Sequence, residues 1–263
     1  MESERGARIG DYNIEGELRS EPTARVYAGV HVVLPRRVAI KILPPEGMKA
    51  HAVQLLREAC ILEALSHPGI PRIYECGVAD DKRPWVAIER IDGTSLAESM
   101  SGRSIAVADL VTVIRGVADI LAHAHARGVV HRRLGEGVVI LTPNRACPLS
   151  VRNWGGVVTY DSHRAAEPTS DVYALGALAY RALTASRLTQ EASAQAECPE
   201  APAGLTHLID DMLARHPTER PSAAEVCERA TWVAETLESA TEQALAVSLA
   251  RAPTVEFAVR IRG

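Results

Sequence analysis

The period of the hydrophobic pattern changes part-way along the chain. Residues 12–43 alternate short strand-like runs with turns and end in the β-branched block 37–43, which precedes Pro44-Pro45. This pattern predicts a small antiparallel sheet. Further along, apolar residues recur with helical spacing over 109–127, 172–183, 204–215 and 222 to about 249. The sequence therefore predicts an α+β protein, with a small sheet-rich part followed by a larger helical part.

One more helix and two more strands are predicted in the first part. Residues 50–66 carry apolar side chains at helical spacing, Val53 and Leu56 among them, and His67-Pro68-Gly69 ends this helix. Short apolar runs at 70–74 and 84–88 predict the strands. Asp92-Gly93 then marks the end of the first part.

The composition of the 263-residue chain excludes several classes of protein. Its formal net charge of -4 gives no basic footprint for nucleic acid or a membrane surface. The 5 cysteines include no CxxC pair, which argues against a disulfide framework and a zinc site and fits a reducing cytoplasm. No run approaches the roughly 18 apolar residues that a membrane span needs. We therefore expect a cytoplasmic chain without a membrane segment.

Short motifs in a fixed order resemble those of the eukaryotic-type protein kinases, in the form found in bacterial serine/threonine kinases. They are Val26-Tyr27, Ala39-Ile40-Lys41, Glu58, His67-Pro68, His131-Arg132, Ala165-Ala166-Glu167, the stretch 170–176 and Arg220-Pro221-Ser222. The resemblance implies a two-lobed kinase-like fold. Its parts would be an N-terminal segment (1–11), a sheet-rich N-lobe with one helix (12–91), a helical C-lobe (92–235), and a helix end with a strand-like tail (236–263).

The same resemblance implies that the side chains that accept the substrate proton and bind the metal ions in the family are missing here. In the family motif H-R-D-L-x-x-x-N the Asp accepts the substrate proton and the Asn binds a metal, but Arg133 and Val138 hold those positions here. An arginine is not deprotonated in a protein, and a valine offers a metal no ligand atom. The metal-binding D-F-G motif aligns with Asn153-Trp154-Gly155, where a neutral amide replaces an anionic ligand. No metal site is therefore expected.

The loop that covers the phosphates in the family is also altered. The glycines of G-x-G-x-x-G align with Arg19, Glu21 and Ala24, so no glycine lets backbone amides approach a phosphate, and Glu21 brings a like charge. Loss of a general base alone costs about 10²- to 10⁴-fold in rate. Ordinary phosphotransfer is therefore expected to be near background.

Other family positions are retained. Lys41 and Glu58 match the ion pair that positions the α- and β-phosphates, and a structural tie between sheet and helix is the alternative reading. The positions that match the adenine pocket and the hinge are Val26, Ala39, Ile140 and Glu89 to Ile91, with ordinary core packing as the alternative. Metal-free ATP binding in this cleft is a hypothesis, and no cofactor is expected to be required.

The resemblance also assigns scaffold roles. His131 and Arg132 keep the frame of the catalytic loop, Asp171 matches the acid that holds the backbone of this loop, and Glu167 and Arg220 match a buried ion pair. For Arg133 two readings stay open. It either pairs with an anionic ligand in the cleft or bonds Asn153 or Glu136 and locks the loop.

Two functions follow from these residues. The first is a pseudokinase, a kinase-fold binding or regulatory module that acts through contacts with an active kinase or another signalling protein. The second is a divergent kinase, or another nucleotide-using enzyme, with weak or unconventional ATP-dependent activity. The alternating residues 254–262 predict an amphipathic strand or, as the alternative, the frayed end of a longer protein.

Overall fold

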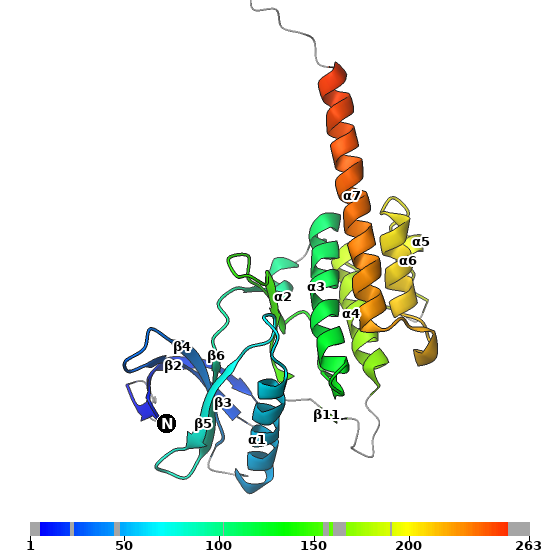
Figure 1. The fold of residues 1–263 in the computed structure, drawn as a ribbon. Coiled ribbons are helices and arrows are strands. Elements are labelled where there is room, and N and C mark those ends of the chain that lie inside the picture. The colour runs from blue at the N-terminus through cyan, green and yellow to red at the C-terminus, as the bar shows by residue number, and fades with distance from the viewer. Residues whose placement is uncertain are drawn as a thin grey trace, which may run out of the picture.

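The computed structural model describes residues 6–21, 24–44, 48–101, 103–154, 158–159, 167–189 and 191–251. It has a sheet-rich N-lobe and a helical C-lobe (Figure 1). The predicted α+β class is therefore confirmed. Gly155, Ala165-Ala166 and the predicted strand at 254–262 lie outside the described residues.

The N-lobe is built on a 6-stranded antiparallel sheet with the strand order β1-β2-β3-β4-β6-β5. The strands are β1 (Arg8–Ile9), β2 (Tyr12–Glu21), β3 (Ala24–His31), β4 (Arg37–Ile42), β5 (Ile73–Val78) and β6 (Pro84–Glu89). Helix α1 (Met48–Ala64) packs Leu55 and Ala59 against Val86 of the sheet. A second apolar cluster around Trp85 includes Tyr12 and Ile40. The sheet thus buries apolar side chains in two separate clusters, only one of which contains residues of α1.

Three details of the N-lobe differ from the prediction. Strand β1 belongs to the sheet and Ile9 is buried, so the lobe begins before residue 12. The strand predicted at 70–74 begins only at Ile73, because Ile70 is buried in the apolar cluster of the C-lobe. Val53 and Leu56 are 71% and 45% exposed, because the side of α1 that carries Leu55 and Ala59 is the one that packs on the sheet.

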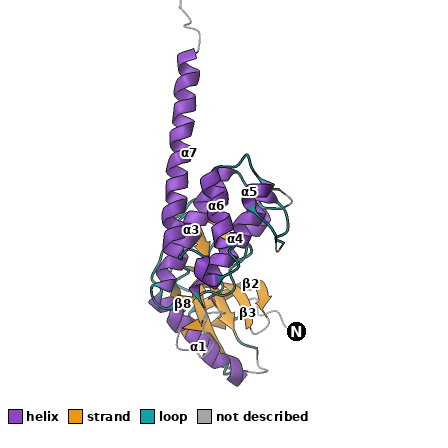
Figure 2. Cartoon of the chain, turned by 90° about the vertical axis from the view of Figure 1, so that its right-hand side faces the viewer, coloured by secondary structure: helices purple, strands orange, loops and turns teal. Residues whose placement is uncertain are grey.

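The C-lobe is a helical unit around α3 (Val107–His125), which packs against α4 (Pro168–Thr184) and α7 (Ala223–Arg251). The other helices are α2 (Leu96–Ser99), α5 (Ala194–Glu197), α6 (Ala203–Met212) and the 3₁₀ turn Pro217–Glu219. Leu110, Ile114 and Val117 are fully buried on α3. Figure 2 shows α3, α4 and α6 gathered on one side of the sheet-rich lobe, which agrees with the predicted order of the two parts.

Two small ladders lie where the C-lobe meets the N-lobe. Strands β7 (Thr94–Ser95), β9 (Val139–Leu141) and β10 (Leu149–Val151) form one of them, and β8 (Val129–Val130) pairs with β11 (Val158–Thr159) in the other. Strand β10 lies against α3 at Gly116, where a Cβ atom would come within 2.6 Å of Leu149 Cδ2. These strands place residues 131–138 and 152–154 side by side, because each stretch borders a ladder.

Helix α7 extends well past the other helices of the C-lobe (Figures 1 and 2). Val226, Ala230 and Val233 are buried, whereas residues 238–243 are exposed. The helix predicted from 222 to about 249 is present, and its packed part ends near Leu237. Among the helices in the described part of the chain, none combines the length and the apolar character that crossing a membrane requires.

Candidate functional site

A cleft of about 380 Å³ is lined by residues of both lobes. Six residues predicted for a nucleotide cleft line it: Val26, Ala39, Lys41, Glu58, Glu89 and Ile91. Ile140 is not among its lining residues, so that part of the prediction is wrong. Ile140 is buried, and the backbone at Gly93 packs closely on it, since a Cβ atom at Gly93 would come within 2.8 Å of Ile140 Cγ2.

Lys41 is held between two carboxylates inside this cleft. Its Nζ lies 2.8 Å from Glu58 Oε2 on α1 and 3.2 Å from Glu21 Oε2 at the end of β2. Burial by itself would lower the pKa of Lys41, but the carboxylates of Glu58 and Glu21 outweigh this effect and raise that pKa. Lys41 therefore stays charged, and both carboxylates compensate its charge.

Glu21 joins this group from the segment that aligns with the phosphate-covering loop. It also accepts a hydrogen bond from Arg19 Nε at 3.0 Å. Burial alone would raise the pKa of Glu21, but Lys41 and Arg19 lower it, so the side chain is an anion at neutral pH. No sequence pattern predicts the contact between Glu21 and Lys41. Only the two-residue spacing of Arg19 and Glu21 along a strand, which puts them on one face, signals a polar cluster here.

The segment after β10 is anchored by Trp154. This side chain is buried, its Nε1–H donates to the Val151 carbonyl at 2.8 Å, and its ring meets that of His131 edge-on with centroids 4.7 Å apart. The preceding Asn153 lines the cleft and has a φ of 67°, a left-handed conformation that asparagine tolerates better than most residues. The position that aligns with the metal-binding Asp is thus inside the cleft but carries an amide.

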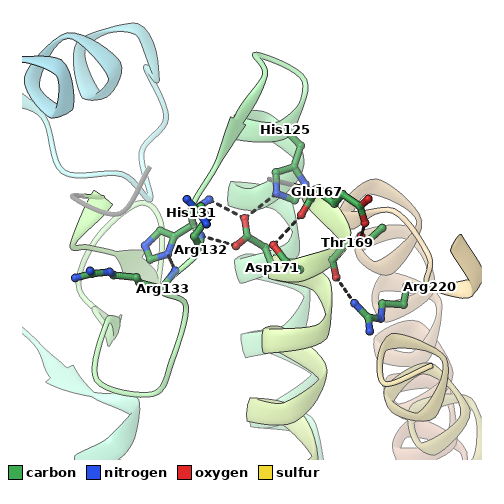
Figure 3. A network of polar contacts seen from close by, with 9 residues as sticks. His125, His131, Arg132, Arg133, Glu167, Thr169, Asp171 and Arg220 are labelled. Carbon is green, nitrogen blue, oxygen red and sulfur yellow. Dashed lines mark hydrogen bonds and ion pairs between the residues drawn. The ribbon is translucent and has the colours of Figure 1, made fainter. Parts of the chain in front are cut away.

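Asp171 on α4 holds the loop that begins at His131 (Figure 3). Its Oδ2 accepts the backbone N–H of His131 and its Oδ1 that of Arg132, both at 2.7 Å. His125 Nε2 lies 3.0 Å from Asp171 Oδ2. The contact that the sequence predicts between Asp171 and the loop backbone is therefore present, and it fixes Arg132 in a left-handed conformation with a φ of 64°.

His131 links this loop to the segment of Asn153. Its Nδ1 accepts the backbone N–H of Arg133 at 3.2 Å, and its Nε2 lies 3.2 Å from the carbonyl oxygen of Arg152. Burial lowers the pKa of His131, against the opposing effect of the Asp171 carboxylate. A neutral imidazole with its proton on Nε2 satisfies both contacts, so His131 acts as a structural tie.

Comparisons with known proteins identify the family to which this cleft belongs. A model of the family described as protein tyrosine and serine/threonine kinase matches residues 15–151. The chain belongs to the protein kinase family. The serine/threonine-protein kinase Pkn1 of Myxococcus xanthus is 28% identical over 271 residues, which cover 87% of this chain and 39% of Pkn1. PknJ of Mycobacterium tuberculosis is 31% identical over 139 residues, which cover 52% of this chain and 23% of PknJ.

A solved structure shows the same fold. The PknI kinase domain of Mycobacterium tuberculosis matches with a TM-score of 0.68 and 23% identity, over 86% of this chain and 97% of that domain. The predicted two-lobed kinase fold is confirmed by this likeness. The chain spans less than half the length of Pkn1 and of PknJ.

Arg133, which the motif H-R-D-L-x-x-x-N aligns with the proton-accepting Asp of the kinase family, is not among the residues that line the cleft. The residue is exposed, and its side chain points away from Asp171 (Figure 3). The predicted lock through Glu136 is wrong, because Glu136 pairs with Arg181 at 3.1 Å. Within the described ranges, no hydrogen bond joins the Arg133 side chain to Asn153.

The predicted ion pair between Glu167 and Arg220 is also wrong. Both residues are described, and the guanidinium of Arg220 donates instead to the carbonyls of Ala214 at 2.9 Å and Thr169 at 3.1 Å. It also stacks on the ring of Tyr173 with 4.6 Å to the ring centroid. Glu167 is exposed at the start of α4. Backbone carbonyls and an aromatic face therefore replace the carboxylate as partners of Arg220.

The residues at the two metal positions of the family do not fit Mg²⁺. Val138 has no ligand atom, and Asn153 offers one neutral oxygen where Mg²⁺ prefers carboxylates. Over the described ranges, no three His, Cys, Asp or Glu side chains gather in a way that would hold a metal ion. Two of the acids that line the cleft, Glu21 and Glu58, are both engaged by Lys41. The side chains at these positions therefore do not reproduce the ligand set that the kinase family uses for its metal ions.

Proposed function

We propose that this member of the protein kinase family is a pseudokinase, a module that regulates through binding and does not carry out ordinary phosphotransfer. The observation that carries the proposal is the contact of Glu21 with Lys41. In the family this lysine positions the α- and β-phosphates of ATP. Here the carboxylate of Glu21 lies beside the ammonium group of Lys41. A triphosphate would therefore meet a negative charge where its oxygens need hydrogen-bond donors.

The positions for proton transfer support the same proposal. Arg133 cannot accept a proton from a hydroxyl group, and its side chain lies outside the cleft. Glu136, the nearest acid in the loop, is paired with Arg181 and so is not free to replace the missing base. The loop itself is well held by Asp171 and His131, which supports a role for its shape. The framework of the catalytic loop is thus retained without its reactive group.

The proposal includes the class of partner. A module without phosphotransfer acts by contact, and we propose an active kinase or another signalling protein as its partner. The basis is the family membership of the chain, since the curated relatives Pkn1 and PknJ are named serine/threonine-protein kinases.

A divergent enzyme is the second candidate, and one observation favours it. The Lys41–Glu58 pair is kept at 2.8 Å, as phosphate positioning in the family requires. Such an enzyme would use ATP weakly or in an unconventional reaction. The two candidates differ in whether Lys41 supports any turnover.

A phosphate-incorporation assay separates these candidates. The purified chain would be incubated with γ-labelled ATP, an acceptor protein and either Mg²⁺ or Mn²⁺, beside a Lys41→Met variant and an active bacterial kinase domain. We expect the chain and its Lys41→Met variant to give the same background signal. Incorporation that is clearly above the signal of the variant would overturn the pseudokinase proposal and favour the divergent enzyme.

A further inference from the structure

Helix α7 carries a large apolar side chain on its surface. Trp232 is 61% exposed, whereas the other two tryptophans of the chain, Trp85 and Trp154, are buried. The ring of Trp232 packs at one edge on the start of α6, where a Cβ atom at Gly204 would come within 3.0 Å of its Cζ3. Most of the ring is left open to solvent. Exposed aromatic side chains that are held in this way are frequent anchors of protein interfaces.

A shallow groove of about 360 Å³ runs along α7 from this tryptophan. It is lined by Trp232, Glu235, Thr236, Ser239, Ala240 and Gln243. The hydroxyl groups of Thr236 and Ser239 donate to backbone carbonyls of the preceding turn, both at 2.9 Å, so they are satisfied within the helix. Small side chains at a contact let a second helix approach closely. The residues from Trp232 to Gln243 also follow at intervals of four, three and four, which is the spacing of a coiled-coil contact.

The groove lies where α7 leaves the C-lobe. The packed part of the helix ends near Leu237, and residues 238–243 are exposed on the part that extends past the other helices (Figures 1 and 2). A partner can therefore lie along this face from Trp232 outward without displacing an element of the C-lobe.

A row of glutamates borders the groove on one side. Glu228, Glu235 and Glu242 are exposed and lie seven residues apart, so they follow one another along one side of α7. Arg229, next to Glu228 in the sequence, pairs instead with Asp211 at 2.7 Å. The sequence has no lysine or arginine from 230 to 250. Cations of this stretch of α7 therefore cannot compensate the row.

Charge decides what can occupy this face. Charged residues beside the contact of a coiled coil select the partner through ion pairs between the helices. A second copy of α7 would bring another row of glutamates and no cation from 230 to 250, so like charges would stay uncompensated. Building on the proposed function, we propose that this face of α7 binds an amphipathic helix of a partner protein. The apolar side of that helix would contact Trp232, and a row of lysines or arginines would pair with Glu228, Glu235 and Glu242.

A designed peptide tests this proposal on the full chain. The probe is a helical peptide of about four heptads, with leucine at the contact positions, lysine beside them and no tryptophan, and the comparison peptide has glutamate in place of lysine. We expect the lysine peptide to bind at least about tenfold more tightly than the glutamate peptide. Because Trp85 and Trp154 are buried, a blue shift of the tryptophan emission on binding reports on Trp232.

Three variants locate the binding face. Glu235→Lys should weaken binding of the lysine peptide and strengthen that of the glutamate peptide, each by about threefold or more. Glu238→Lys is the matched control, because it reverses an exposed glutamate two positions from Thr236, on the opposite side of the helix, and should change neither. Trp232→Ala should weaken binding of the lysine peptide by at least about tenfold and abolish the emission shift.

Several results would overturn the proposal. They are no binding of the lysine peptide, equal binding of the two peptides, and equal effects of Glu235→Lys and Glu238→Lys. A dimer of the chain alone in light scattering that Trp232→Ala dissociates would assign the face to a second copy and overturn it as well. If Trp232→Ala does not fold, the two glutamate variants provide the test. The pseudokinase proposal is tested separately, since it fails only if phosphate incorporation depends on Lys41.

Discussion

At the scale of single residues, the chemistry of the cleft depends on how the positive charge of Lys41 is compensated by the carboxylates of Glu21 and Glu58. Its two carboxylates differ in exposure, with side chains that are 8% exposed for Glu58 and 16% for Glu21. Removing one partner of a buried ion pair leaves an uncompensated charge and destabilises a protein strongly, whereas a second carboxylate limits that effect. The two contacts with Lys41 should therefore depend on each other.

Substitution of the two glutamates tests this coupling. We expect Glu21→Gln to lower the free energy of unfolding by about 1 kcal/mol and Glu58→Gln by about 2 kcal/mol, because each leaves Lys41 one carboxylate. The double variant should lose about 4 kcal/mol or more, clearly beyond the sum. Urea unfolding measures all three, and Glu15→Gln at the exposed pair with Arg90 is the control, with a change below about 0.5 kcal/mol. Strictly additive losses would contradict the shared role of the carboxylates.

The buried His131 predicts a pH dependence of stability. Because burial lowers its pKa in the folded chain, the unfolded chain binds a proton at about pH 6.5 while the folded chain does not. The free energy of unfolding should therefore fall as pH drops below this value, by at most about 1.4 kcal/mol per pH unit from this group. His131→Gln should show a smaller slope, with a remainder from His123, whose pKa burial also lowers. NMR of the imidazole would contradict this if His131 were protonated at about pH 6.5 in the folded chain.

At the scale of elements, helix α4 and the loop at 131–133 form one unit. Asp171 is in the first turn of α4, where a carboxylate is favoured by the helix dipole, and it accepts two backbone N–H groups of the loop. The loop thus takes its shape from a helix that begins well after it in the chain. Order in the loop should be lost when this one side chain changes.

Asp171→Asn is the test at this scale. An amide can accept only one of the two backbone N–H groups well, so a buried donor is left without a partner and stability should fall by about 1 to 3 kcal/mol. Hydrogen exchange at the amides of His131 and Arg132 should become faster than in the unchanged chain. Asp109→Asn, also in a first helical turn but exposed, should cost a few tenths of a kcal/mol (about 0.3) and leave those two amides unaffected. Unchanged protection in Asp171→Asn would exclude this role.

Elements with one strong period are the ones that the sequence predicts well. The helix predicted over 109–127 corresponds to α3 at Val107–His125, since its apolar side chains repeat without a break. The prediction for β5 is misplaced because this strand lies at the edge of the sheet and carries exposed Glu75 and Cys76, so its pattern does not alternate clearly. Pattern alone also does not reveal that Ile70 packs in the other lobe.

At the scale of the whole molecule, the order of the motifs predicts the two lobes and six residues that line the cleft, but not the contacts among the side chains inside it. The contact of Glu21 with Lys41 depends on how β2 and β4 lie beside β3. That Arg19 and Arg152 line the same cleft depends on how the lobes meet, which no local pattern encodes. The ion pair between Glu167 and Arg220 is predicted only from the positions of these residues in the family motifs. That prediction is wrong because backbone carbonyls accept the hydrogen bonds of Arg220.

Stability should also vary along the molecule, and helix α7 gives the clearest case. Its buried Val233 belongs to the core of the C-lobe, whereas residues 238–243 are exposed in the part of the helix that extends beyond it (Figure 1). Amides near Val226 and Val233 should exchange only by global unfolding, and those of 238–243 much faster by local opening.

Two variants of α7 separate these parts of the helix. Val233→Ala should lower the free energy of unfolding by about 2 kcal/mol, because it removes two buried carbon groups from the core. Ala240→Gly costs about 1 kcal/mol in helix propensity, but this loss should appear only as faster exchange over 238–243, because that segment opens before the lobe unfolds. Chemical denaturation and hydrogen exchange measure the two effects. A fall in global stability with Ala240→Gly as large as with Val233→Ala would mean that the exposed half of α7 is part of the cooperative core.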